Sequence, residues 1–308
     1  LIGLVGSEMC IRDRSDNQWN VNNSQSTKNA LFIPRFQELC EKYGFKPVYL
    51  VDYSMANDDF LVEYLSKCQQ CGTCEIGMHL HAWDTPPMAE LDIINGARPY
   101  LIEYPKEVME AKIFELDKLL KSKFDCEIIS HRAGRWAMND EYFDILKKYG
   151  YKIDCSYTPG INWSAVIGAN IGGADYSKVE GKPHIHSHSG ILEVPATINK
   201  IRYIKKNSLK EVVKFILGRN VWIRPAMFDN KEILTLIENN TSYVSEFMMH
   251  SSELMPGGSP YFKNEIEIEL LYSNLEKLFK EVSKTHKGAT LTEVYKDFMS
   301  STGEKNGI

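Results

Sequence analysis

Two histidines, His79 and His81, stand two residues apart at the end of an apolar stretch, 75–80, that is typical of a β-strand. Residues i and i+2 of a strand project from the same face, with their α-carbons about 7 Å apart. Neutral imidazoles in that position can bind one metal ion through Zn–N bonds of about 2.0–2.1 Å. The aromatic and double-proline segment 83–87 is suited to fixing the surrounding loop. The pattern therefore predicts a metal site, with structural or exposed histidines as the alternative.

Three further strand ends carry polar side chains. Arg132 follows a strand expected over 127–130, and its guanidinium is suited to orienting a carboxylate. Asp154 follows another short strand and can place a carboxylate next to Arg132, although a turn residue is the simpler interpretation of Asp154 alone. His250 ends an apolar strand over 244–249, and its pKa near neutrality suits a general acid or base. Because α/β folds collect functional groups at strand ends, these residues predict one site together with the histidine pair.

The elements that must position this site alternate between helix and strand along the whole chain. Helices are predicted over 31–43, 58–65, 105–120, 139–149, 209–217, 230–238, 262–284 and 291–299, and further strands over 48–51, 191–194 and 221–223. The pentapeptides 42–46 and 148–152 are nearly identical, and each has a glycine able to end a helix ahead of a strand. An irregular excursion runs from about 156 to 190. No linker divides the chain, so a single α/β domain is expected over 15–308.

The first fourteen residues, LIGLVGSEMCIRDR, look like translated sequencing-adaptor read-through, and the chain begins with Leu. We therefore expect residues 1–14 to be a non-native segment and native sequence to begin at about Ser15. The alternative is a genuine first strand, because residues 1–5 are compatible with β-structure.

The amino-acid composition of the chain excludes some classes of function. The 308 residues include 36 Lys and Arg against 41 Asp and Glu, a net charge of −5, which argues against a generally basic nucleic-acid binder. No apolar run approaches the roughly 18 residues of a membrane span. Seven cysteines, an odd number, in a chain with no recognisable signal peptide favour a reducing, cytoplasmic compartment. The oligomeric state is left open.

Several segments, in this order, resemble those of the NodB-homology polysaccharide deacetylases, carbohydrate esterase family four. They are HLHAW with TPP, RAGRW, DCSYTPG, EVPATI and HSSELMPGGSP, and they are most similar to the WalW-like branch associated with lipopolysaccharide biosynthesis. The resemblance covers about residues 16–265. It implies an α/β fold, a distorted (β/α) barrel of the NodB type whose first strand is truncated or replaced here. It also implies a divalent metal, commonly zinc, held by one acidic residue and two histidines.

The resemblance assigns roles to individual residues. The implied metal ligands are His79, His81 and Asp16; the implied catalytic residues are His250 as general acid and Arg132 with Asp154 as the pair that orients the base. The substrate-binding candidates are Trp83, Arg135, Trp136, Tyr157 and Glu253. The branch normally opens with an acidic cluster, but the matching residues 12–19 read RDRSDNQW, so arginines stand where the base and a neighbouring acid are expected and only Asp16 is in register.

The implied activity is removal of an N-acetyl group from an acetamido sugar, in an N-acetylated glycan or a sugar–lipid. A non-catalytic carbohydrate-binding protein that keeps the cleft but lacks the base is the alternative. Glycoside hydrolysis is a weaker option because two paired carboxylates are not evident. Two other groups could bind a metal: the thiolates of Cys68, Cys71 and Cys74, or the imidazoles of His184, His186 and His188. Incidental cysteines and an exposed loop or substrate rim are the respective alternatives.

Overall fold

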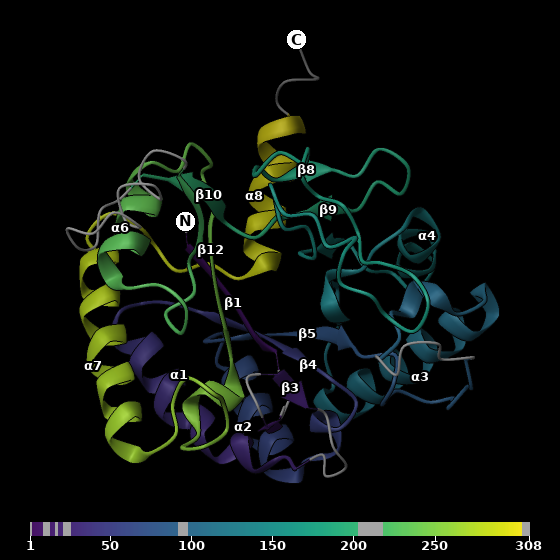
Figure 1. Cartoon of the computed structure of the whole chain (residues 1–308), viewed down its shortest axis with the longest axis horizontal. Helices are drawn as coiled ribbons and strands as arrows, with labels where there is room; N and C mark the ends of the chain where they lie inside the picture. Colours follow the sequence, from purple (N-terminus) through teal and green to yellow (C-terminus); the bar gives the residue numbers. More distant parts are fainter. Residues whose placement is uncertain are drawn as a thin grey trace.

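The structure, a computed structural model, describes residues 26–91, 98–202 and 218–302 with their side chains, and the backbone of 2–8, 13–15, 18–20 and 303 (Figure 1). Its main element is an eight-stranded sheet in the order β12-β1-β4-β5-β6-β7-β9-β8. These strands are β1 Ile2–Glu8, β4 Pro47–Val51, β5 Glu75–Leu80, β6 Ser130–Ala133, β7 Ile153–Asp154, β8 His184–Ile185, β9 Leu192–Glu193 and β12 Ser245–His250. The six successive pairings from β12 to β9 are parallel, whereas β8 pairs with β9 antiparallel. Two antiparallel hairpins accompany it: β2 Asp13–Ser15 with β3 Gln18–Asn20, and β10 Ile198–Ile201 with β11 Arg219–Trp222.

Helices connect the strands, as the alternating pattern predicts. They are α1 Ile33–Lys42, α2 Asp59–Gln70, α3 Lys106–Phe124, α4 Asp140–Lys148, α6 Asn230–Glu238, α7 Glu265–Val282 and α8 Leu291–Gly303. Short 3₁₀ helices lie at Lys28–Phe32, Met55–Asn57, Leu101–Glu103, Gly134–Trp136 and Ser251–Leu254. The helix expected over 209–217 lies outside the described residues. Within the described part of the chain, no helix has both the length and the apolar character needed to cross a membrane.

The first strand of the chain, β1, lies within residues 1–14, the segment that we expect from the sequence to be non-native. The backbone of β1 pairs with β12 on one side and with β4 on the other, and places Glu8 opposite His250. This backbone agrees with the β-compatible interpretation of residues 1–5. The non-native origin of residues 1–14, and the domain boundary drawn from it, stay predictions.

Alternating residues of the strands enter different cores. The outward-facing residues of β4 and β5, Tyr49, Val51, Ile76, Met78 and Leu80, pack with apolar residues of α2, α3 and α4. The inward-facing residues Val48 and Leu50 instead pack with Leu291 and Val294 of α8. The N–H of Thr292 in α8 donates to Glu75 at the start of β5, so α8 covers the amino-terminal end of the interior. The opposite end, at the carboxyl ends of the parallel strands, holds the polar residues described below.

The sheet curves enough for its strands to meet across the interior. Arg132 of β6 forms an ion pair with Glu246 of β12, although β1, β4 and β5 separate these strands in the sheet. The segments around β10 and β11 bridge the remaining side: the N–H of Glu246 donates to Oγ1 of Thr197 at 2.8 Å, and the N–H of Met248 to the carbonyl of Ile223 at 3.0 Å. No strand ladder closes the ring among the described residues. The α/β prediction is confirmed, with a barrel that is distorted and open.

Candidate metal centre

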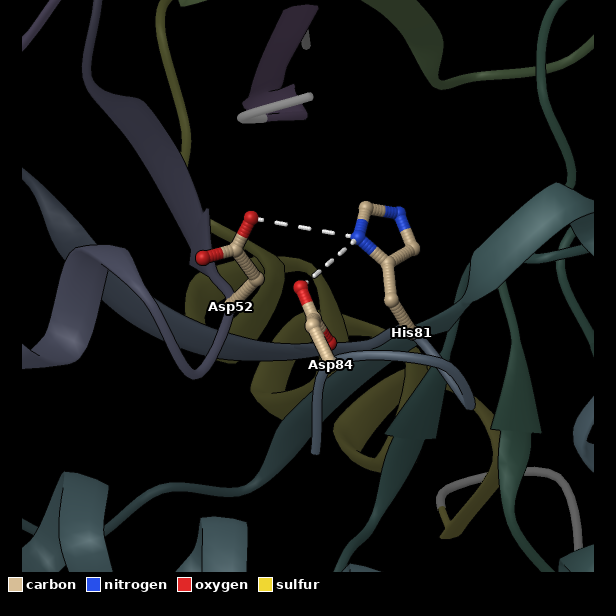
Figure 2. A group of neighbouring side chains, drawn as sticks. All are labelled: Asp52, His81 and Asp84. Carbon is tan, nitrogen blue, oxygen red and sulfur yellow. Dashed lines mark ion pairs between the residues drawn. The ribbon is translucent and has the colours of Figure 1, made fainter. Parts of the chain in front are cut away.

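The carboxyl ends of β4 and β5 bring one histidine and two aspartates together (Figure 2). Asp52 directly follows β4, His81 directly follows β5, and Asp84 lies in the next turn. Nδ1 of His81 is 3.9 Å from Oδ2 of Asp52 and 3.7 Å from Oδ2 of Asp84. Two ligands of one zinc ion lie no further apart than twice the bond length, roughly 4.2 Å. Both distances from His81 therefore fit a common cation, and we call these three residues the edge cluster.

Strand alternation explains why the edge cluster faces inward. Asp52 continues the face of β4 that carries Leu50, and His81 continues the face of β5 that carries His79. The N–H of Met55 donates to Oδ1 of Asp52 at 2.9 Å, which fixes that carboxylate and turns its second oxygen toward His81. The sequence therefore prearranges the cluster through its strand register and one backbone hydrogen bond.

The edge cluster is almost fully buried and has unfavourable electrostatics of its own. The side chains of His81, Asp52 and Asp84 are 2%, 3% and 4% exposed. Burial and, to a smaller extent, the neighbouring charge of Asp84 raise the pKa of Asp52 to about 7, against the opposite effect of His81. A bound cation would offset the repulsion between two carboxylates held in a poorly solvated site. Two oxygens and one imidazole nitrogen are ligands suited to zinc and similar divalent ions.

His79 lies beside the edge cluster rather than in it. Among the described residues, the group of converging ligand atoms contains His81 but not His79. Nδ1 of His79 donates to the carbonyl of Arg132 at 2.9 Å, which leaves the lone pair on Nε2. The two imidazole rings are 4.4 Å apart between centroids and nearly perpendicular. A ligand role for His79 stays a prediction, and Asp16 lies outside the described residues.

The expected contact between Arg132 and Asp154 is wrong. The β6–β7 register places His131, not Arg132, opposite Asp154. Asp154 accepts a hydrogen bond from Nδ1 of His131 at 2.6 Å, whereas Arg132 faces inward, pairs with Glu246 and donates to the carbonyl of Cys155. Burial alone would raise the pKa of Asp154, but the hydrogen bond from His131, the charge of His131 and the hydrogen bonds from Glu193 and Ser156 together outweigh it, and the pKa is lowered. The strand expected over 127–130 lies at Ser130–Ala133, so Arg132 is inside it.

His250 ends β12, and Glu253 holds the turn that follows it. The N–H of His250 donates to Oε2 of Glu253 at 3.1 Å, and the His250 side chain accepts from the N–H of Glu253 in return. Oε1 of Glu253 pairs with Arg224 at 2.8 Å. Glu253 is completely buried, and its contact with substrate stays a prediction. Because β1 alone separates β12 from β4, His250 and Asp52 stand two strands apart at the same sheet edge.

The remaining substrate-binding candidates are all half-buried and differ in what they contact. The half-buried ring of Trp83 stacks on that of His81, with centroids 4.5 Å apart, and Trp136 lies 5.0 Å from the guanidinium carbon of Arg132. Tyr157 packs its ring against Tyr176 and Phe143. Arg135 donates to the carbonyls of residues 98 and 167 and stacks over Tyr100, so its described contacts hold loops together.

Neither of the two other candidate metal-binding groups, the cysteines of 68–74 and the histidines of 184–188, brings three ligand atoms together in the described structure. Within the part of the chain that the structure describes, the edge cluster is the one group of three ligands that converge. His186 stacks on Phe143, and His188 lies 3.1 Å from Asp144. Cys71 is exposed, whereas Cys68 and Cys74 are buried.

Sequence reasoning missed two members of the edge cluster. Asp52 follows the apolar strand 47–51 in the same way that the predicted residues follow theirs, so the strand-end signal was present. Asp84 stands three residues after His81, within the segment that the sequence singles out. Only the fold shows that these two carboxylates face one imidazole.

Comparisons with known proteins define the fold. No protein-family model matches the sequence, and no curated protein is similar to it. A protein described as a polysaccharide deacetylase from Mycobacterium smegmatis has a similar structure, with a TM-score of 0.53 and 12% identity over 89% of this chain and 79% of that one. An allantoinase gives 0.54 and 11% over 97% and 90%. The 4-alpha-glucanotransferase of Thermococcus litoralis gives 0.55 and 14%, but the 96% of this chain that aligns spans only 40% of that enzyme. The chain thus has the fold of these proteins.

Proposed function

We propose that the chain is a metal-dependent hydrolase that removes an N-acetyl group from an acetamido sugar of a cell-surface polysaccharide or its precursor. The observation that carries this proposal is the edge cluster, with three buried ligand atoms that converge at the carboxyl edge of the sheet. The resemblance of the surrounding motifs to WalW-like polysaccharide deacetylases supports the choice of reaction and of zinc. An N-acetylated glycan or sugar–lipid as substrate, and a cytoplasmic location, belong to the same proposal.

The chain's own residues supply the other parts of the reaction. Asp52, His81 and Asp84 would hold the cation, which when bound supplies Lewis-acid polarisation of water and of the acetyl carbonyl. The carboxylates of Asp52 and Asp84 are also positioned to accept a proton at the site. His250, which the Glu253 turn holds at the same edge, donates a proton to the leaving amine.

A non-catalytic carbohydrate-binding protein is the second candidate. The observation that favours it is the segment 12–19, where Arg12 and Arg14 stand in place of the acidic residues that the resemblance leads us to expect. Arginine stays protonated at neutral pH and cannot act as the base. A protein of this kind would bind the glycan and the metal without releasing acetate.

Acetate release from N-acetylated oligosaccharides distinguishes the two candidates. We expect the zinc-loaded chain to release acetate, a chelator to stop the reaction, and added zinc to restore it. The variant His186→Ala, which alters a histidine outside the edge cluster, is the matched control and should behave like the wild type. Stoichiometric zinc with glycan binding but no acetate would support the binding protein instead. A chain that binds no divalent ion would overturn both.

A further inference from the structure

One lysine lies on the buried face of helix α3. Lys112 shares that face with Met109, Ile113 and Leu116, which belong to the core around α2, α3 and α4, and it has no exposed surface. Moving an ammonium group from water into such surroundings is unfavourable unless hydrogen bonds compensate for the lost hydration. The partners of Lys112 therefore indicate why a lysine stands at this position.

The ammonium group of Lys112 holds the segment that follows β5. Nζ donates to the carbonyl of Thr85 at 2.6 Å and to that of Pro87 at 2.7 Å. This segment forms neither helix nor strand as far as residue 91, so its carbonyls need donors from side chains. The hydroxyl of Tyr104 donates to the next alternate carbonyl, that of Ala89, at 3.4 Å, and the centroid of its ring lies 5.1 Å from Nζ. Two side chains thus hold three alternate carbonyls of the segment.

Packing supports the same segment only in part. A cavity of about 520 Å³ borders it, and the residues that line the cavity include Trp83, Leu91 and Tyr104 as well as Lys112. Met88, in the middle of the segment, is 70% exposed. The hydrogen bonds from Lys112 therefore supply support that packing does not give on this side.

Thr85 connects the lysine to the edge cluster. Its Oγ1 donates to Oδ1 of Asp84 at 3.2 Å, and its N–H donates to the carbonyl of His81 at 3.2 Å. Thr85 has no exposed surface, so these contacts are shielded from water. Because Thr85 holds Oδ1 of Asp84, Oδ2 is the oxygen that faces Nδ1 of His81 (Figure 2).

The two carboxylates of the edge cluster are oriented in the same way but supported differently. In each, Oδ1 accepts a hydrogen bond from a neighbouring residue and Oδ2 faces His81. Asp52 takes its hydrogen bond from the backbone directly after β4. Asp84 takes its hydrogen bond from a hydroxyl in a turn outside the sheet, and that turn is held by a lysine 27 positions further along the chain. The position of Asp84 thus depends on a second element of the fold.

We propose that Lys112 is a positioning residue of the metal site: its two hydrogen bonds fix the turn that carries Asp84 and, through Thr85, keep the Asp84 carboxylate directed at the cation. This inference rests on the proposed function, and it adds to the site a residue that no motif of the sequence singles out. A lysine that serves only the stability of α3 and the turn is the alternative.

Lys112 keeps its positive charge at neutral pH. Burial lowers its pKa to about 8, whereas the negative charge of Asp84 acts in the opposite direction. A positive charge close to the edge cluster repels a divalent cation, so the charge of Lys112 alone would weaken zinc binding. A loss of zinc affinity after neutral replacement of Lys112 would therefore report on the position of the turn and not on the charge.

The zinc affinity of the full chain, measured by competition with a chelator of known affinity, tests the inference. Lys112→Met keeps the length of the side chain but removes both hydrogen bonds, and we expect it to weaken zinc binding roughly 10–100-fold. Thr85→Val, which removes the hydroxyl alone, should weaken it roughly 3–10-fold. Lys118→Met is the matched control, because it removes an exposed lysine of the same helix, and it should bind zinc like the wild type.

A double-mutant cycle shows whether Lys112 acts through Asp84. In an Asp84→Ala background, Lys112→Met should weaken zinc binding by less than about threefold, because the ligand that it positions is already absent. A purely structural role would lower the melting temperature of Lys112→Met and leave its zinc affinity unchanged in both backgrounds.

The outcomes separate the inference from the proposed function. Equal zinc affinity of the wild type and Lys112→Met, or the same loss with and without Asp84, would overturn the inference and leave the proposed function intact. A folded wild-type chain that binds no zinc would overturn the proposed function and the inference with it. Thermal melting shows whether each variant folds; if Lys112→Met does not, unchanged zinc affinity in Thr85→Val would overturn the inference.

Discussion

Two buried groups of the barrel combine histidine with carboxylate, yet they differ in how their polar atoms meet. In the edge cluster, Nδ1 of His81 is 3.7 Å and 3.9 Å from its two carboxylates, too far for hydrogen bonds. On the other side of the sheet a closed cluster joins Tyr142, His131, Asp154 and Ser156 through hydrogen bonds of 2.6 to 2.8 Å. The edge cluster has the spacing of ligands around an ion, whereas the closed cluster satisfies its own polar atoms.

The pKa values of Asp52 in the edge cluster and Asp154 in the closed cluster differ in the same way. Burial and the charge of Asp84 together raise the pKa of Asp52 to about 7. Asp154 is as deeply buried, but its hydrogen bonds from His131 and Ser156 reverse the effect of burial and lower its pKa. Residue type and burial therefore do not distinguish a binding site from a structural pair; the distances between the polar atoms do.

The largest expected effect follows from removing the nitrogen ligand of the edge cluster. His81→Ala should lose zinc affinity by on the order of 100-fold or more and lose acetate release with it, because no other described ligand faces both carboxylates. Metal analysis and acetate assays measure both effects. The matched variant His188→Ala, at an exposed histidine, should retain zinc. Unchanged zinc in His81→Ala would remove the distinction between the clusters.

The second prediction concerns the acid at the same edge. His250→Ala should lower the rate of deacetylation roughly 10²–10⁴-fold while the protein keeps its zinc, because a proton donor contributes to the rate and not to the metal site. Steady-state rates with paired metal analysis test this. A loss below about threefold would exclude His250 as the general acid.

The closed cluster should respond to mutation through stability instead. Asp154→Asn removes the carboxylate that accepts buried hydrogen bonds from His131 and Ser156, and we expect the free energy of unfolding to fall by about 1–3 kcal/mol. Urea denaturation gives this value, and zinc per folded chain should not change. A stable Asp154→Asn protein that has lost its zinc would show that the closed cluster contributes to the metal site after all.

The smallest effect concerns Glu75, a buried carboxylate at the opposite end of the interior. Burial raises its pKa, against hydrogen bonds from Ser130 and Thr292. The folded state therefore binds the proton more tightly than the unfolded state, and stability falls as the pH rises from the unfolded value, near 4.5, through the raised folded value. Glu75→Gln should remove this loss and gain less than about 1 kcal/mol at pH 8 relative to pH 5. Parallel denaturation curves at both pH values, without a relative gain, would contradict it.

The sequence correctly predicts local features of the fold, such as the glycines that end helices α1 and α4. Gly44 and Gly150 in the repeated pentapeptides both take positive φ, at 73° and 90°, directly after helices α1 and α4. These features depend on neighbouring residues alone, so the pattern of glycine and aromatic residues is sufficient to locate them.

The sequence alone does not predict which residues of different strands contact one another. The pairing of Arg132 with Glu246 joins residues 114 positions apart through the curvature of the sheet. The one-residue register that gives Asp154 to His131 rather than Arg132 is likewise set by strand pairing. Asp52 had the same strand-end signal as His250 but no neighbouring motif, and only the fold places it opposite His81.

An anomalous difference map from crystals of the zinc-loaded protein, recorded across the zinc absorption edge, tests the metal site most directly. We predict one strong peak within bonding distance of Oδ2 of Asp52, Nδ1 of His81 and Oδ2 of Asp84. A peak at the histidines of 184–188 or at the cysteines of 68–74, with none at the edge cluster, would contradict it.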